Sequence, residues 1–364
     1  MDKGTMKALK YHGPHQISLD DVPLPRIMEP TDALLKVTTS TICGSDIHIM
    51  QGAFDFLEPG FTIGHEFCGE IVELGSSVGS GFKVGDRVAV SCISHCGKCH
   101  NCLNGLPQYC PVPSGGQFPI SQIMGTFIDG CQQEYIRVPF AETGMYNIPE
   151  SLSDDNVLFV GDILSTGYFG AEQCHIQPGD IVLVVGSGPV GMCAMACARL
   201  WGPSLIIAVD LDQSRLDTAL KNGICDAGIN AEKEDAMAKV MELTNGYGAE
   251  CVIEANGAGQ TIDFAIKSAR VGGRVGIVGL PAGIYSLDAT PTPAGLFFKH
   301  LTISWGEVPA NHIPRLISLI EKGQLDLRFL ITHRKPLNDI IEGYDIFGNK
   351  KDGCLKWVVT PYVR

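Results

Sequence analysis

The feature that most constrains the fold is a glycine-rich loop placed between an apolar run and a stretch of helical periodicity. The run Ile181–Val185 leads directly into the loop, and the helical pattern continues to Leu200. Glycines in the pattern G-x-G-x-x-G allow a tight turn, a close approach of the backbone to a pyrophosphate, and close packing of helix on strand. The helix N-terminus adds free N–H groups and a partial positive charge. We therefore predict a dinucleotide-binding loop that consists of Gly186, Ser187, Gly188, Pro189, Val190 and Gly191.

A carboxylate at the end of the next strand indicates which dinucleotide binds. The second apolar run, Leu205–Val209, is followed by Asp210, nineteen residues after Gly191. A carboxylate here can accept hydrogen bonds from both ribose hydroxyls of NAD and would repel the 2′-phosphate of NADP. The sequence therefore favours NAD over NADP. Arg215 follows five residues later and is either a neighbour of the adenosine ribose or a solvated helix residue.

From Ile181 onward, short apolar runs alternate with amphipathic stretches of helix length. Uninterrupted apolar strands that alternate with helices imply a parallel sheet buried on both faces, which predicts a doubly wound α/β domain. The expected strands are Ile181–Val185, Leu205–Val209, Cys251–Glu254 and Arg274–Val278, and the expected helices are Val190–Leu200, Gln213–Asn222, Glu232–Thr244 and Gln260–Ala269.

The first third of the chain has a different pattern, in which short alternating segments are separated by Gly and Pro. Period-2 alternation with turn residues between predicts an antiparallel, barrel-like β domain. After about Trp305, periodicity alone assigns the remaining segments to neither domain. The expected early strands are Met6–Tyr11, Ala33–Thr41, Phe67–Leu74, Arg87–Cys92 and Glu134–Pro139, and the expected late elements are two helices, Ile313–Lys322 and Leu337–Phe347, and a strand, Leu355–Thr360.

Composition excludes several classes of protein. The 364 residues carry a net charge of −13, so we expect no nucleic-acid partner, because binding to phosphate backbones needs a basic face. No apolar run reaches the roughly 20 residues that span a bilayer, and Met1–Lys10 has no hydrophobic signal core. We therefore expect a cytoplasmic protein without membrane contact. In that compartment the 14 cysteines suggest metal binding and buried thiols rather than disulfides.

Four cysteines lie close together in one loop. Their spacing is C-x2-C-x2-C-x7-C, and four thiolates so placed can bind one tetrahedral zinc ion in a closed, structural site. The loop has few large apolar residues, so the metal would supply the order that a core cannot. A redox CxxC pair and an iron–sulfur cluster are the alternatives, and Cys92, four residues upstream, adds a further thiol. The predicted structural ligands are Cys96, Cys99, Cys102 and Cys110.

Two further fragments carry groups suited to an open metal site. They are Thr41-Ile-Cys-Gly-Ser-Asp-Ile-His48 and Gly64-His-Glu-Phe-Cys-Gly-Glu70, and each lies beside a predicted strand. With the cysteine loop and the glycine loop, in this order, the chain resembles the zinc-containing medium-chain alcohol dehydrogenases from about Met6 to its last strand. The resemblance implies a GroES-like β-barrel catalytic domain at 1–164 with a zinc lobe at 92–112, a Rossmann NAD-binding domain at 165–303, and a return to the catalytic domain at 304–364.

The resemblance also implies a catalytic zinc, and so two zinc ions per chain. By analogy Cys43 and His65 are ligands, and the third ligand comes from the stretch Phe159–Tyr168. The best-known members have a cysteine there, whereas this chain has Asp162, as in branches similar to secondary-alcohol and formaldehyde dehydrogenases. Aspartate is a competent zinc ligand and should leave the metal a somewhat harder Lewis acid.

Five more residues take roles from the same resemblance. Glu66 either coordinates transiently or stays next to the ligands, and Asp46 resembles the carboxylate that orients the ring of His65. Ser45 resembles the hydroxyl that contacts the substrate oxygen. His48 resembles the base that passes the proton toward solvent through the nicotinamide ribose, a role that suits a pKa near 6.5. Thr166 would help to hold the nicotinamide.

The predicted activity is hydride transfer between a small, preferably secondary, alcohol or ketone and NAD(H). Threonine, polyol and formaldehyde dehydrogenases share most of this machinery, and a non-catalytic NAD(H)-binding redox sensor is the alternative from another class. A threonine enzyme would need a cation for the substrate carboxylate, and none is evident beside these motifs. Relatives form dimers or tetramers, which implies a homo-oligomer. Phe54, Ile120 and Trp305 are candidates for shaping the substrate pocket.

Overall fold

The computed structural model describes residues 4–54, 56–281, 283, 285–292 and 295–362. By its internal contacts the chain divides into two compact units. Unit 1 comprises residues 1–165 and 309–364, and unit 2 comprises residues 166–308. The second boundary follows residue 308 rather than the expected 303, because the strand Thr302–Trp305 pairs within the sheet of unit 2.

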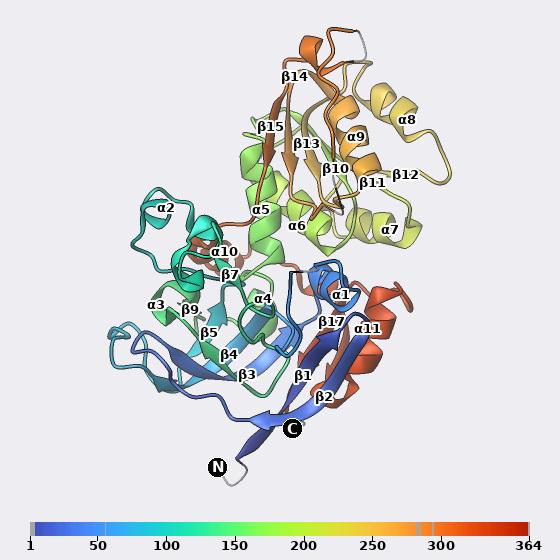
Figure 1. Cartoon of the computed structure of the whole chain (residues 1–364). Coiled ribbons are helices and arrows are strands. Elements are labelled where there is room, and N and C mark those ends of the chain that lie inside the picture. The colour runs from blue at the N-terminus through green and yellow to red at the C-terminus, as the bar shows by residue number, and fades with distance from the viewer. Residues whose placement is uncertain (1–3, 55, 282, 284, 293–294, 363–364) are drawn as a thin grey trace. The chain divides into compact units, whose positions relative to one another are not determined.

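Unit 1 is built on a seven-stranded sheet in which β3 pairs with β4, β8 and β17. All of its pairs are antiparallel except β16 with β17. Figure 1 shows β3, β4 and β5 side by side in the blue to cyan part of the chain. The strands are β3 (Ala33–Thr41), β4 (Glu66–Leu74), β5 (Arg87–Val90), β8 (Tyr135–Val138), β9 (Met145–Asn147), β16 (Ile331–Pro336) and β17 (Lys356–Thr360).

Two small sheets and six short α-helices complete the described part of unit 1. Strand β1 pairs with β2 in a hairpin, and β6 pairs with β7. Buried apolar side chains of β3, β4 and β5 pack together in a core on the sheet, as the alternation in the sequence predicts. The elements are β1 (Thr5–Gly13), β2 (Gln16–Pro23), β6 (Ile93–Ser94), β7 (Gln122–Ile123), α1 (Gly44–Met50), α2 (His100–Leu103), α3 (Ala141–Gly144), α4 (Asp154–Val157), α10 (Ile313–Glu321) and α11 (Ile340–Gly348).

Unit 2 is a six-stranded sheet with the order β12-β11-β10-β13-β14-β15, and every pair is parallel. The predicted doubly wound sheet is therefore confirmed. Figure 1 shows α8 and α9 on one side of this sheet and α5 on the other. The strands are β10 (Ile181–Val185), β11 (Leu205–Asp210), β12 (Ala227–Asn230), β13 (Ala249–Glu254), β14 (Ala269–Ile277) and β15 (Thr302–Trp305).

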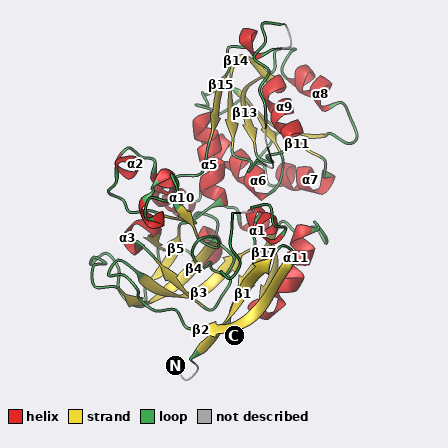
Figure 2. Ribbon diagram, viewed as in Figure 1, coloured by secondary structure: helices red, strands yellow, loops and turns green. Residues whose placement is uncertain are grey.

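Helices separate the strands of unit 2, and Figure 2 shows this alternation of red helices with yellow strands. The helix α5 begins in the last residues of unit 1 and continues into unit 2, where it packs against α6: a Cβ on Gly167 would lie 2.5 Å from the backbone N of Ala194. The helices are α5 (Ile163–Gln173), α6 (Pro189–Ala198), α7 (Gln213–Lys221), α8 (Ala236–Leu243) and α9 (Gly259–Ser268).

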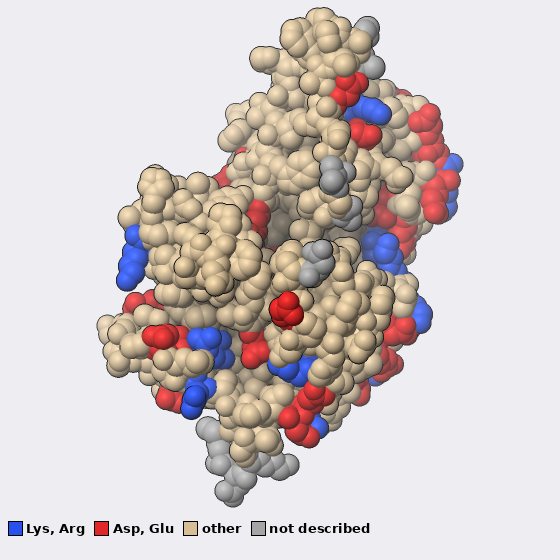
Figure 3. Space-filling view, in the orientation of Figure 1, with Lys and Arg blue, Asp and Glu red and all other residues tan. Residues whose placement is uncertain are grey.

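The surface carries both signs of charge. Figure 3 shows acidic and basic side chains interspersed on the face in view, with no continuous basic stripe among the residues drawn in colour. Across the described residues, none of the helices is both long enough and apolar enough to cross a bilayer.

Candidate functional site

The strand register of unit 1 brings together residues that are far apart in the sequence. Thr41, the last residue of β3, pairs with Glu66 on β4 and with Val358 on β17. Cys43 follows Thr41 by two residues and forms the N-cap of α1, and His65 immediately precedes β4. One end of the sheet therefore carries the two fragments that the sequence singles out.

Asp162 completes the group from a third segment, just before α5. Its Oδ2 lies 3.4 Å from Cys43 Sγ and 3.2 Å from His65 Nε2. One ligand atom from each of Cys43, His65, Glu66 and Asp162 lies within 4.8 Å of the others. Ligands at about 2.0–2.3 Å from a tetrahedral zinc are roughly 3.3–3.8 Å apart, so these side chains fit one ion.

The orientation of the His65 ring follows from its partners. Asp46 is fully buried, its Oδ1 lies 3.2 Å from His65 Nδ1, and its Oδ2 accepts the backbone N–H of Cys43 at 2.8 Å. A carboxylate beside Nδ1 favours the tautomer with the proton on Nδ1. The lone pair of Nε2 is then directed toward Asp162 and toward Ser45 Oγ, which lies 3.1 Å away.

A buried ion pair includes Glu66, one of these four side chains. Lys356 Nζ, on β17, donates to Glu66 Oε1 at 2.5 Å and to the carbonyl of Ile42 at 3.0 Å. The other oxygen, Glu66 Oε2, is buried and has no hydrogen-bond partner among the described residues. Sequence reasoning missed Lys356. The available signal was a single lysine inside the otherwise apolar run from Leu355 to Val359.

The electrostatics of Cys43, His65, Glu66 and Asp162 favour a cation. Burial raises the pKa of the Glu66 carboxyl to about 7, although Lys356 opposes the rise. Burial, and then the carboxylates of Glu66 and Asp162, raise the pKa of the Cys43 thiol to about 11. Burial alone would lower the pKa of His65, but Asp46 and Cys43 hold it well above its usual value. Cys43, Glu66 and Asp162 thus repel one another where water is excluded, and a divalent ion would relieve that repulsion.

The two residues expected to move protons lie on α1. Ser45 Oγ lies 3.1 Å from Nε2 of His65, a candidate metal ligand. His48 lies one turn further along and is partly buried, which lowers its pKa. The structure thus places Ser45 against the ligand group, and it places His48 on the same short helix.

The four cysteines of the lobe also lie together. Cys99 Sγ lies 3.5 Å from Cys102 Sγ and 3.7 Å from Cys110 Sγ, and Cys110 Sγ lies 3.6 Å from Cys96 Sγ. A backbone N–H from Cys102 lowers the pKa of Cys99 to about 7. Four sulfurs at these separations fit one tetrahedral ion. Cys92 is buried and is not one of the four, so the extra thiol does not alter this ligand set.

The glycine loop of unit 2 has the geometry that its sequence predicts. Gly186 has φ 97°, in the left-handed region, and a Cβ on Gly191 would lie 1.8 Å from the Gly186 carbonyl oxygen. Gly188 is the N-cap of α6, with Pro189 in the first turn. The loop therefore needs glycine at the turn and at the helix–strand contact, and it leaves a helix N-terminus available to phosphates.

Asp210 ends β11 and anchors the loop. Its Oδ2 accepts the backbone N–H of Ser187 at 2.6 Å, and its Oδ1 accepts that of Asp212 at 2.9 Å. Arg215 lies beside Gly188, with its Nη1 3.7 Å from where a Cβ would stand. The structure thus groups Asp210, Arg215 and the loop, while Val190 lies in α6 and Thr166 in α5.

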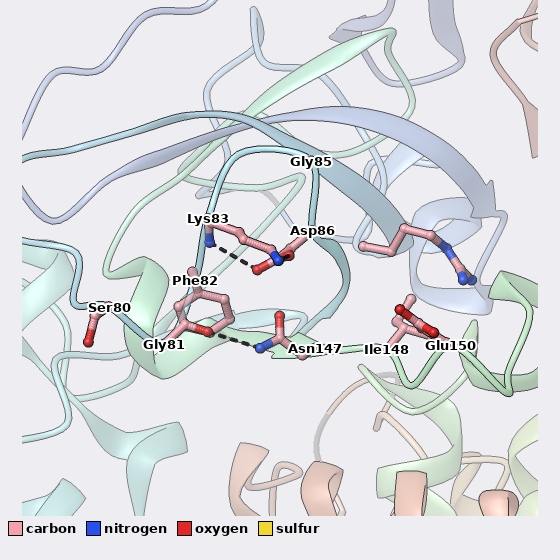
Figure 4. Close-up of a pocket in the computed structure, with 10 residues that line it drawn as sticks. Ser80, Gly81, Phe82, Lys83, Gly85, Asp86, Asn147, Ile148 and Glu150 are labelled. Atoms are coloured by element: carbon pink, nitrogen blue, oxygen red, sulfur yellow. Dashed lines mark hydrogen bonds and ion pairs between the residues drawn. The ribbon is translucent and has the colours of Figure 1, made fainter.

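A surface hollow of about 520 Å³ lies elsewhere in unit 1 (Figure 4). It is lined by the turn Ser80–Lys83, by Asp86 and Arg87, and by Asn147, Ile148 and Glu150 at the end of β9 and just after it. Asn147 donates to the Gly81 carbonyl at 3.0 Å across it. None of the candidate metal ligands lines this hollow, and we assign it no part in the site.

Comparisons with known proteins identify the family. The sequence matches the alcohol dehydrogenase GroES-like domain over residues 29–150 and the zinc-binding dehydrogenase domain over residues 189–322. An alcohol dehydrogenase of Cupriavidus necator is 36% identical over 98% of this chain and 99% of its own. An L-threonine 3-dehydrogenase of Bacillus licheniformis is 34% identical over 98% of this chain and 99% of its own.

A solved structure agrees with these relatives. Zinc-dependent alcohol dehydrogenase 2 from Streptococcus pneumonia, in its apo form, has a TM-score of 0.90 and 34% identity, with 99% of each chain covered. The predicted combination of a GroES-like domain with a Rossmann-type domain is confirmed. The chain therefore belongs to the zinc-dependent alcohol dehydrogenases, a family of oxidoreductases.

Proposed function

We propose that this protein transfers a hydride between a small secondary alcohol, or the corresponding ketone, and NAD(H). The observation that carries the proposal is the approach of Cys43, His65 and Asp162 to within bonding reach of one ion. A thiolate, an imidazole and a carboxylate form an open catalytic zinc site, because three protein ligands leave a fourth position for substrate. When bound, zinc supplies Lewis-acid polarisation of the substrate oxygen.

The ligands and the residues beside them have separate roles. Asp46 fixes the tautomer and the ring plane of His65, so that Nε2 is directed to the metal. Glu66 has one oxygen held by Lys356 and the other without a hydrogen bond, which suits a residue that can approach the metal during ligand exchange. Cys43 and Asp162 set the charge of the site.

Proton movement is assigned to α1. Ser45 Oγ, beside the ligand His65, contacts the substrate hydroxyl and accepts its proton as it donates its own onward. His48 is the terminal base, since a lowered pKa keeps its imidazole neutral at pH 7. Replacement of Ser45 by Ala should therefore lower the turnover number, while zinc content stays unchanged.

The glycine loop and Asp210 hold the dinucleotide. Backbone N–H groups at the start of α6 bind the pyrophosphate, and Gly188 leaves room for it. The Asp210 carboxylate accepts the ribose hydroxyls and disfavours the 2′-phosphate of NADP. Arg215 flanks the adenosine ribose, and Thr166 helps to hold the nicotinamide. When bound, NAD accepts the hydride that the alcohol loses.

Threonine is the second candidate substrate, because one relative bears the name L-threonine 3-dehydrogenase. A threonine carboxylate needs a cation, and the cation found beside the metal ligands, Lys356, is already paired with Glu66. This pairing favours an uncharged alcohol. Polyols and formaldehyde adducts fit the same chemistry and belong in the same assay.

We also propose the domain roles that the family suggests, in a cytoplasmic homo-oligomer. Unit 1 would be the catalytic domain, with the four-cysteine lobe, and unit 2 the NAD-binding domain. Cys68, Cys131 and Cys197 are buried thiols outside any disulfide, which suits a reducing compartment. Sedimentation of the purified protein would distinguish a dimer from a tetramer.

One assay tests the function. Purified protein would be given secondary alcohols, primary alcohols, polyols and threonine, each with NAD and with NADP, and absorbance followed at 340 nm. We expect the highest kcat/KM with a secondary alcohol and NAD, and loss of activity after chelation. Binding of NADH without turnover of any alcohol would instead indicate a redox sensor.

A further inference from the structure

We infer that Gln132 and Tyr344 are positioning residues that fix the orientation of His65 through Asp46. The inference rests on the proposed zinc ligands, because it explains how one of them is held. Neither residue belongs to a motif in the sequence. Gln132 lies between the cysteine lobe and β8, and Tyr344 lies on α11, near the C-terminus.

Hydrogen bonds connect Tyr344 to Gln132 and Gln132 to Asp46, and Asp46 in turn lies in ion-pair contact with the ligand His65. Tyr344 Oη donates to Gln132 Oε1 at 2.8 Å, and Gln132 Nε2 lies 3.4 Å from Asp46 Oδ2. Asp46 Oδ1 then lies 3.2 Å from His65 Nδ1. All four side chains are buried, so water cannot replace a missing partner at low cost.

The direction of donation allows only one arrangement of the Gln132 amide. The Asp46 carboxylate is an acceptor, so the group that faces it must be the Gln132 NH₂. Oε1 then faces Tyr344, whose hydroxyl can donate to it. A reversed amide would place two acceptors together at Asp46. Tyr344 therefore selects the amide orientation that supports Asp46.

Gln132 itself has little freedom to move. Its backbone N–H donates to the Ile63 carbonyl at 3.0 Å, and its carbonyl accepts the Leu9 N–H at 2.9 Å. A Cβ on Gly64 would lie 2.6 Å from Gln132 Cγ, so the glutamine stem occupies space that only a glycine before His65 leaves open. The amide is thus held against the backbone that carries the ligand.

Asp46 depends on this support because it has two tasks. One oxygen must stay at His65 Nδ1 while the other accepts the Cys43 N–H, and rotation of the carboxylate would disturb both ligands. Loss of an outer partner of a metal ligand commonly lowers metal affinity by about 10–100-fold. We expect an effect of this size from Gln132→Met and a smaller one from Tyr344→Phe.

Each variant has a matched control in unit 1. Gln133 is also a buried glutamine, and its Nε2 donates to the Gly130 carbonyl at 2.7 Å, so Gln133→Met removes a similar amide elsewhere. Tyr146 donates to the Thr143 carbonyl at 3.0 Å, which makes Tyr146→Phe the control for the lost hydroxyl. Neither control residue touches the metal ligands.

The experiment measures metal binding directly. Full-length protein would be titrated with a chromogenic chelator to determine the affinities of the two zinc ions, and the visible spectrum of the Co²⁺-substituted protein would be recorded. We expect Gln132→Met to weaken the catalytic ion at least tenfold and to shift the Co²⁺ bands, with the cysteine-bound ion unchanged. Tyr344→Phe should also weaken binding of the catalytic ion and shift the Co²⁺ bands in the same direction.

The outcomes separate this inference from the proposed function. If wild type binds both ions and Gln132→Met and Tyr344→Phe match their controls in affinity and spectrum, the positioning role is wrong. If wild type binds no second ion, the ligand assignment itself fails. If Gln132→Met does not fold, Tyr344→Phe decides, since it removes a single oxygen atom.

Discussion

Lys356 holds one oxygen of Glu66 at 2.5 Å, in a place where both side chains are almost completely buried. A buried charge that loses its partner costs roughly 3–5 kcal/mol, because no solvent replaces the lost contact. Lys356→Met should therefore lower the free energy of unfolding by about that amount at pH 8. Urea denaturation of the zinc-free protein measures this change, because a bound cation would itself lower the pKa of Glu66.

The loss should shrink as the pH falls. The pKa of Glu66 is already raised to about 7, and removal of Lys356 raises it further, so the folded protein binds a proton more readily than the unfolded one. Below that pKa Glu66 is neutral and needs no partner. A Lys356→Met variant that is equally destabilised at pH 6 and pH 8 would contradict this account, and the double variant with Glu66→Gln should show no pH dependence from this pair.

Asp162 should be required for the catalytic ion alone. Asp162→Asn removes a negative ligand while it keeps the side-chain volume, so we expect the zinc content to fall from two ions to one per chain and turnover to drop at least 1,000-fold. Asp162→Cys restores a thiolate and should retain both ions. Metal analysis and assays would show this, with Asp154→Asn, an aspartate paired with Arg87, as the control that keeps two ions.

Local spacing explains which parts of the site could be predicted. The glycine loop and the four cysteines each lie within one short segment, so the physical demands on them are visible in sequence. Lys356 and Tyr344 contribute through the sheet register and through α11, from more than 200 residues away in the sequence. Nothing near them in the sequence indicates a partner. Such residues become visible only when the chain is folded.

Two helices differ from the sequence prediction, and local capping or tertiary packing explains each difference. The helix expected at Glu232–Thr244 begins at Ala236, because the Asp235 side chain accepts the Ala238 N–H at 3.0 Å and caps it there. The helix α5 was not predicted. It contains Gly167 and Gly170, which disfavour helix in isolation, and tertiary packing that needs small residues outweighs this preference.

Loss of the lobe metal should affect stability more than chemistry. Cys102→Ser removes one of four sulfurs, and a lobe with few apolar contacts of its own should then lose its ion and its order. We expect one zinc per chain, faster proteolysis within residues 96–110, and a lower melting temperature. After mild chelation, the Cys102→Ser variant should still retain its catalytic zinc by metal analysis. Cys225→Ser, a buried thiol outside both clusters, is the control.

Asp210 should control the choice of dinucleotide. Asp210→Ser removes the charge that repels a 2′-phosphate, so the ratio of kcat/KM for NAD to that for NADP should fall at least tenfold. The Ser187 N–H also loses its acceptor, so KM for NAD should rise. Initial rates with each cofactor measure both effects. Asp217→Asn, on the exposed side of α7, removes an equal charge and should leave the ratio unchanged.

His48 should set the acid limb of the rate profile. Burial lowers its pKa below 6.5, so the folded protein keeps a neutral imidazole, able to take a proton, until the pH falls below that value. Alcohol oxidation should therefore decline only at a pH below 6.5, and stability should fall in the same window because the unfolded chain binds the proton more readily. His48→Gln should remove this limb and reduce turnover about 100-fold, at the lower end of the roughly 10²–10⁴-fold range of general acid–base effects. An unchanged acid limb in His48→Gln, with His12→Gln as the exposed control, would transfer the proton step to another group.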